Sequence, residues 1–97
     1  MRFEWDDAKN RLNLGKHGIT FERAVLVFED PHALSFQDRF VAGEERWQTF
    51  GLVYGHVVMV AHTWRENEKG EEVIRLISAR NAASHEKRIY EAHKGAG

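Results

Sequence analysis

The sequence predicts an α+β domain in which helices cover an antiparallel sheet. Three observations lead to this expectation. The first third of the chain contains two segments with helical spacing of apolar residues, and the middle changes to runs of aromatic and β-branched residues. The last segment returns to a helical composition. We therefore expect the order β-α-α-β-β-β-β-α, with two N-terminal helices and one C-terminal helix.

The chain opens with a predicted strand and a capped helix. Residues 3–5 alternate apolar and polar side chains, which is typical of a short strand. Asp6 has the place of an N-cap, because its carboxylate can accept hydrogen bonds from the free N–H groups of the next turn. The helix that starts at Asp7 should end at Gly18, since glycine readily adopts the left-handed conformation that follows many helices.

Helical spacing predicts the two sides of this first helix. Ala8 and Leu12 lie one turn apart, and we expect both on its inner face. Lys9, Asn13 and Lys16 follow at spacings of four and three residues. This spacing places two amines and an amide on one exposed stripe.

A second helix is predicted directly after the first. Thr20 can cap its beginning, and Asp30-Pro31 should end it, because the residue before a proline avoids helical conformation. The apolar residues at spacings i, i+3, i+4 and i+7 predict one buried face, formed by Phe21, Ala24, Val25 and Phe28.

The middle of the chain predicts four strands, at residues 33–37, 46–53, 57–64 and 73–77. Tyr54-Gly55-His56 should form a tight hairpin, and the charged segment 66–71 the following turn. The last strand is apolar on both faces apart from Arg75, which is typical of a central strand.

Asn81 can cap a final helix that runs to about His93, and the glycine-containing end at residues 95–97 should fray. The side chains expected to face the core from this segment are Ala82, Ile89 and Tyr90.

Composition excludes several classes of protein. The 97 residues contain one proline and no repeat, so we expect residues 1–97 to form a single domain. Apolar runs reach only five residues, as at 57–61, and the charged N-terminus does not resemble a signal peptide, so we expect a cytoplasmic protein without a membrane segment. The absence of cysteine excludes disulfides, thiolate metal sites and a cysteine nucleophile.

The net charge of −1 is unevenly distributed. Residues 1–20 carry a net charge of +1, residues 21–72 carry −5 and residues 73–97 carry +3. The two ends of the chain could therefore build a basic face for a nucleic acid, or the charges could simply be solvated.

The six histidines show no spacing that is typical of a metal site. His17 stands out because it ends the first helix beside Lys9 and Lys16. An imidazole among cations suits proton transfer near a bound phosphate, although it could equally bond the last carbonyls of the helix.

Three arginines lie at the ends of predicted strands. Antiparallel neighbours bring such ends together, so Arg46, Arg65 and Arg80 could converge on one edge of the sheet. Guanidinium groups suit phosphate because they donate two parallel hydrogen bonds. Alternatively, each arginine could be paired with a nearby glutamate, the candidates being Glu44, Glu45, Glu66 and Glu86.

Two groups of motifs resemble the BrnT family. The first runs from Phe3-Glu4-Trp5-Asp6 through Lys16-His17-Gly18 to Asp30-Pro31, and the second is the segment 74–80, Ile-Arg-Leu-Ile-Ser-Ala-Arg, followed by Glu86 and Tyr90. Together, and in this order, they cover nearly the whole chain.

This resemblance implies a toxin of a type II toxin–antitoxin pair, with a RelE-like fold. It implies an endoribonuclease that arrests translation without a metal or other cofactor, through attack of the ribose 2′-hydroxyl on the adjacent phosphate. It also implies a ribbon-helix-helix antitoxin, operator DNA bound only through that antitoxin, and a dimeric complex.

Carried onto this chain, the resemblance gives roles to seven residues. Arg46, Arg65 and Arg80 would clamp the scissile phosphate, and His17, or failing it Lys16, would transfer a proton. The expected RNA-binding residues are Lys9, Lys16 and Tyr90. Two other readings remain: a non-enzymatic module that binds a protein or nucleic acid, and a histidine-rich metal-dependent hydrolase.

Overall fold

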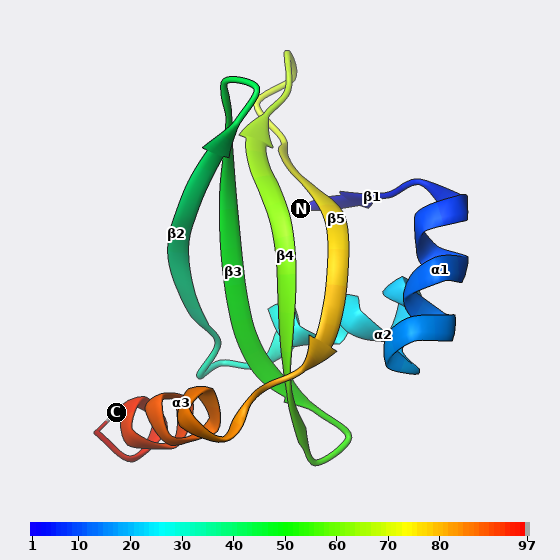
Figure 1. Cartoon of the computed structure of the whole chain (residues 1–97). Coiled ribbons are helices and arrows are strands. Elements are labelled where there is room, and N and C mark those ends of the chain that lie inside the picture. The colour runs from blue at the N-terminus through cyan, green and yellow to red at the C-terminus, as the bar shows by residue number, and fades with distance from the viewer. Residues whose placement is uncertain (97) are drawn as a thin grey trace.

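The computed structural model describes residues 1–96, which form one five-stranded sheet with helices on both faces (Figure 1). The strand order is β1-β5-β4-β3-β2. The strands are β1 (Arg2–Glu4), β2 (Leu34–Val41), β3 (Glu44–Val53), β4 (His56–Glu66) and β5 (Glu72–Asn81). The helices are α1 (Asp7–His17), α2 (Phe21–Ala24), the 3₁₀ helix η1 (Val25–Glu29) and α3 (Ser84–Ala96). None of the described helices is long and apolar enough to cross a membrane.

The α+β class is confirmed, but the prediction of a purely antiparallel sheet is wrong. Strands β2 to β5 are antiparallel because short turns join them, whereas β1 pairs with β5 in parallel through Arg2 and Val73 and the two pairs that follow. β1 and β5 are far apart in the sequence and no hairpin joins them, so this pair need not be antiparallel. The sheet is therefore mixed.

The predicted second helix is regular over only one turn. Thr20 caps α2 as expected, accepting a hydrogen bond from the N–H of Arg23, but the helix tightens into η1 at Val25. Short 3₁₀ segments are common where an α-helix ends. Here η1 packs closely on β3: a Cβ on Gly51 would stand 2.7 Å from the Val27 carbonyl oxygen. Only glycine permits this approach.

Two predicted caps are confirmed at α1. The Asp6 carboxylate accepts hydrogen bonds from the N–H groups of Ala8 and Lys9, and Gly18 adopts the left-handed conformation with φ of 71°. The tight hairpin between β3 and β4 is confirmed as well, since Tyr54 and Gly55 both have positive φ. This pair of angles is typical of a type I′ turn.

The predicted cap of the last helix is wrong. β5 continues to Asn81 because β4 pairs with it along its whole length, and α3 begins only at Ser84. The Glu86 carboxylate takes over the capping role and accepts a hydrogen bond from the Ala83 N–H. The helix also runs beyond His93 to Ala96, so the expected fraying at 95 and 96 is absent, and Gly97 lies outside the described residues.

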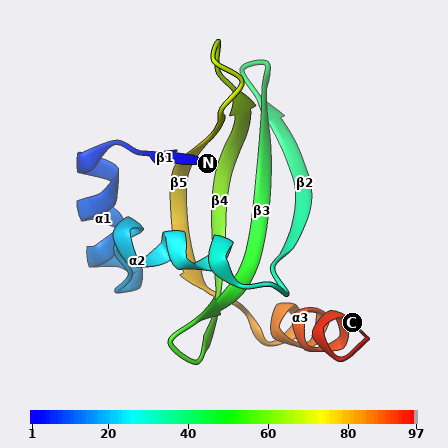
Figure 2. The same cartoon turned by 180° about the vertical axis from the view of Figure 1, so that it is seen from behind.

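The two faces of the sheet have different cores. α2 and η1 cover one face, seen in Figure 2, with α1 beside the β5 edge, and Phe21, Val27 and Ile74 are fully buried on this face. On the other face, α3 covers only the lower end, and Tyr90 packs there with Phe50. Ile89, which we expected to face inward, is exposed, because its neighbour Tyr90 occupies the inward direction.

The inner face of α1 is polar, contrary to the prediction. Leu12 is 73% exposed, and Asn13 is buried. The Asn13 amide donates to the carbonyls of Ala79 and Ile19, both at 2.9 Å, and its oxygen accepts from the Ala79 N–H at 3.0 Å. Beyond the three residues that pair with β1, the outer edge of β5 has no neighbouring strand, and Asn13 satisfies its backbone groups instead.

A second asparagine joins α1 to α2. The Asn10 oxygen accepts from the Phe21 N–H at 2.8 Å, and its amide donates to Glu22 at 2.7 Å. Together, Asn10 and Asn13 determine how α1 lies on the rest of the molecule.

We expect Asn13→Ala to lower the free energy of unfolding by about 3 kcal/mol, since it leaves the backbone groups of Ala79 buried without partners. Urea unfolding followed by circular dichroism measures the change. The matched control is Arg11→Ala, an exposed position on the same helix, which should stay within about 0.5 kcal/mol of wild type. Equal stability of the two variants would contradict this role of Asn13.

Candidate functional site

The three arginines predicted to form a phosphate clamp lie on the sheet face opposite α1 and α2. Arg80 pairs with Met59, which belongs to the core under α3. Trp47 and Trp64 point to the sheet face on the α1 side. Their chain neighbours Arg46 and Arg65 therefore point to the opposite face, because successive side chains alternate along a strand.

Each of these arginines lies beside a glutamate, but the buried Nε of Arg46 makes no hydrogen bond within residues 1–96. Arg65 contacts Glu4 at 2.9 Å, and the Arg46 Nε lies 3.8 Å from Glu44. Glu44 also binds Arg75. Arg75 and Arg80 are five residues apart on β5, so their Cα atoms are separated by roughly 16 Å along the strand. Arg80 therefore lies far from Arg46 and Arg75, which share Glu44, and the three predicted arginines do not meet at one phosphate.

The Arg80–Glu86 pair joins the end of β5 to α3. Its two parallel hydrogen bonds measure 2.7 and 3.0 Å. The hydrogen bond from Arg80 is the main cause that lowers the pKa of Glu86 to about 2, against the opposing effect of burial. Arg80 is thus committed to a structural contact in this structure.

Tyr90 is also part of the core. It is fully buried, and its hydroxyl donates to Asp30, whose other oxygen accepts from the His32 N–H. Burial, followed by the Asp30 carboxylate, raises the pKa of Tyr90. No face of the ring is left for stacking on a base.

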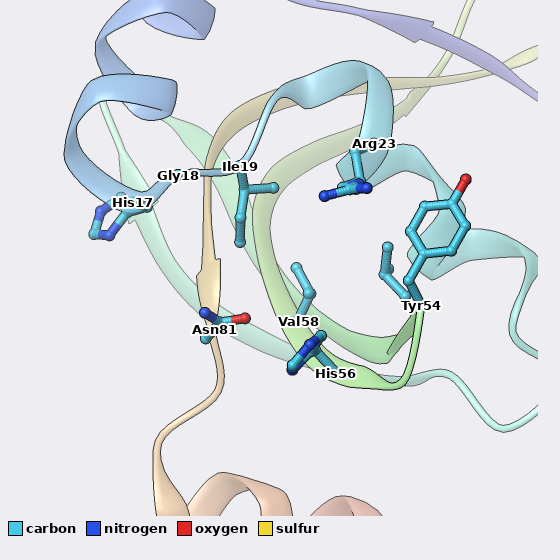
Figure 3. A pocket seen from close by; sticks show the side chains of 9 residues that line it. His17, Gly18, Ile19, Arg23, Tyr54, His56, Val58 and Asn81 are labelled. Carbon is cyan, nitrogen blue, oxygen red and sulfur yellow. The ribbon is translucent and has the colours of Figure 1, made fainter.

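A small cavity of about 150 Å³ lies where the α1–α2 connection meets the β3–β4 hairpin and the end of β5 (Figure 3). We call it the histidine cavity. Its polar lining consists of His17, Arg23, Tyr54, His56 and Asn81.

Local backbone geometry places these groups. Gly18 turns the chain sharply after His17, and the Tyr54-Gly55 turn presents His56 from the opposite segment. The Arg23 guanidinium lies 4.7 Å from the centre of the Tyr54 ring, a cation–π contact that holds it at the cavity. Among the described residues no acidic side chain lines the cavity, so its charge is positive or neutral.

A second cavity, of about 240 Å³, lies between α1 and β5 and shares His17 with the first. Its other polar lining residues are Lys9, Asn13, Lys16 and Ser78, and we call it the lysine groove. Within residues 1–96 it too has no acidic lining residue. The lysine groove and the histidine cavity together form a basic strip with His17 at their junction.

The structure thus divides the predicted site residues into two sets. Lys9, Lys16 and His17 are brought together, and Arg46, Arg65, Arg80 and Tyr90 are elsewhere. Sequence reasoning missed Arg23, His56 and Asn81 as members of the strip. The position of His56 directly after a turn could have identified it as a candidate site residue, since loop residues are often exposed and functional.

The remaining histidines do not add a metal site. His62 is fully buried: its Nε2 lies 2.7 Å from the Thr49 hydroxyl, and its Nδ1 lies 2.9 Å from the Thr63 carbonyl. Burial lowers the pKa of His62. The part of the chain that the structure describes contains no group of three or more histidine, cysteine, aspartate or glutamate side chains that could hold a metal ion.

A small mixed α+β domain with two histidines and an arginine in one concave, acid-free strip has the composition of a phosphodiester-binding site. Residues 5–86 match the family described as the ribonuclease toxin BrnT of type II toxin–antitoxin systems. The chain therefore belongs to the BrnT family, as the sequence motifs indicated. No curated protein matches the chain.

We expect the Glu86→Gln variant to lose less stability in acid than wild type. The pKa of Glu86 is about 2 in the folded protein and 4.5 ordinarily, so its ionised form stabilises the fold above pH 4.5, and this contribution disappears as the pH falls toward 2. Melting temperatures between about pH 6 and pH 3 measure the difference. Parallel curves for the two proteins would show that the Arg80–Glu86 pair does not stabilise the folded state.

Proposed function

We propose that this protein is a metal-independent endoribonuclease that cleaves RNA at the histidine cavity and thereby arrests translation. Membership of the BrnT family gives the general activity, a ribonuclease toxin of a type II toxin–antitoxin system. The observation that supports this location is the acid-free cavity with His17, His56 and Arg23 in its lining.

Two imidazoles and a guanidinium suit the cleavage of a phosphodiester by the neighbouring 2′-hydroxyl. One imidazole accepts the proton of the hydroxyl as its oxygen attacks phosphorus, and the other donates a proton to the departing 5′-oxygen. Arg23 and the Asn81 amide offset the additional negative charge on the phosphoryl oxygens in the transition state. The products are a 2′,3′-cyclic phosphate and a 5′-hydroxyl, so the reaction needs no cofactor.

The lysine groove would bind the RNA strand next to the cleaved bond. Lys9 and Lys16 lie on the same helix as His17, and the cavity that they line opens onto it. Contacts between amines and backbone phosphates release counterions, so binding through this groove should weaken as salt is raised.

We place Arg46, Arg65 and Arg80 outside the catalytic centre. A guanidinium that is bound to a carboxylate must give up that contact before it can bind a phosphate, and this exchange reduces the gain. The cavity histidines and Arg23 form no ion pair with the described residues.

The type II class implies an antitoxin partner and RNA targets. As part of the proposal, the fold is RelE-like and the antitoxin carries a ribbon-helix-helix domain. The complex is then dimeric and reaches operator DNA only through the antitoxin, and the toxin acts in the cytoplasm. These assignments are supported by the family resemblance.

We expect His17→Ala and His56→Ala each to slow cleavage of an RNA oligonucleotide by about 10²–10⁴-fold, because each removes one proton-transfer group. The readout is a gel assay on a labelled RNA that contains every dinucleotide step. His93→Ala, at an exposed histidine of α3, is the matched control and should cleave like wild type. Melting curves show that each variant is folded.

Arg80→Gln distinguishes the two candidate locations. We expect it to lower stability and to leave the cleavage rate of the folded protein close to wild type. If Arg80→Gln abolishes cleavage while both cavity histidine variants remain fully active, the catalytic centre lies on the open face of the sheet, and our assignment is wrong.

We expect EDTA to leave the cleavage rate unchanged, and a single 2′-deoxy substitution at the cleaved nucleotide to block the reaction. Mass spectrometry of the product should show a terminal cyclic phosphate. Loss of activity in EDTA that zinc or magnesium restores would favour a metal-dependent hydrolase instead.

A further inference from the structure

The outer face of α1 is apolar although it faces solvent. Asn10, Asn13 and His17 point toward the rest of the molecule, and Ala8, Leu12 and Gly15 form a stripe on the opposite side. This is the reverse of the usual pattern, in which the apolar stripe of a surface helix faces the core. α1 lies at the side of the molecule, where nothing in the described chain covers this stripe (Figures 1 and 2).

The stripe forms a shallow groove of about 630 Å³ together with Arg11 and Lys16. The residue types that line this groove are not required for folding. A Cβ added at Gly15 would meet nothing within 4 Å, and Leu12 is largely exposed, so neither residue is determined by internal packing. An exposed apolar surface rimmed by polar groups is typical of an interaction site.

The charges around the groove indicate the chemistry of its partner. Arg11 lies on one flank, and Lys9 and Lys16 lie on the other, as helical spacing requires. No carboxylate lines the groove within residues 1–96. A complementary surface therefore needs apolar side chains in the middle and acidic side chains on both sides.

We propose that this groove binds an amphipathic, acid-flanked helix of the cognate antitoxin. An antitoxin partner follows from the type II class of the family, and a helix presents apolar residues at the spacing that matches the stripe on α1. Two helices packed in this way approach closely at the small residues Ala8 and Gly15, with Leu12 between them.

The position of Lys16 explains how such a helix would neutralise the toxin. Lys16 lines both this groove and the lysine groove, where it is expected to bind RNA. An acidic side chain that pairs with Lys16 would occupy the cation and cover the approach to His17. This part of the inference rests on the proposed function, whereas the docking of the antitoxin does not.

The test uses the double variant Ala8→Glu, Gly15→Glu, which adds two carboxylates to the stripe at positions that contact no core residue. The control is Leu14→Glu, which adds one carboxylate at an exposed position of α1 outside the groove. The probe is the purified protein encoded by the reading frame adjacent to the gene of this chain, and isothermal titration calorimetry measures its affinity.

We expect the double variant to bind this protein at least about 100-fold more weakly, through like-charge repulsion with its acidic flanks, and Leu14→Glu to bind like wild type. The maximal rate of RNA cleavage by both variants without the antitoxin should equal that of wild type, because none of the substituted positions lines the histidine cavity. Equal antitoxin affinity of the double variant and wild type would overturn the proposal.

Two further readouts distinguish other outcomes. If wild type is a dimer in sedimentation experiments and the double variant is a monomer with unchanged antitoxin affinity, the groove joins two copies of this chain, and the antitoxin assignment is wrong. If wild type binds the antitoxin through the groove but cuts no RNA, the docking proposal is supported, and only the proposed catalytic function fails.

Discussion

The arrangement of this protein depends on the hydrogen bonds between Asn13 and the edge of β5. β1 is too short to pair with all of β5, and the backbone groups of Ala79 would be buried without partners if the Asn13 amide did not bind them. Because three hydrogen bonds fix one side chain, they fix the rotation of α1 about its axis. That rotation brings His17 and the two lysines to the basic strip and leaves the apolar stripe outside.

The open face of the sheet shows why counting basic residues does not locate a site. Arg46, Arg65 and Arg80 share a face but do not converge on one edge as predicted, and each of them lies beside a glutamate. The basic strip contains the cations Lys9, Lys16 and Arg23, and no carboxylate of the described structure lines it. For an anionic ligand the absence of a competing carboxylate matters more than the number of cations.

Much of the fold was predictable because its signals are local. Asp6, Gly18, Thr20 and the Tyr54-Gly55 turn act through their immediate neighbours, and all four were identified from the sequence. The inverted α1 was missed because its cause is the unpaired edge of a strand that follows sixty residues later, as the Asn13–Ala79 contact shows. The same limit applies to the site: His17 was found through its sequence neighbours, whereas Arg23 and His56 join it only in the folded chain.

The reversed polarity of α1 also bears on how such a protein can change over evolutionary time. Residues on its solvent side contact no core atoms, so replacements there alter the surface without disturbing folding. Residues on its inward side are held by specific backbone partners and tolerate little. A single eleven-residue helix therefore combines a side that folding leaves free to change with a side whose contacts preserve the architecture.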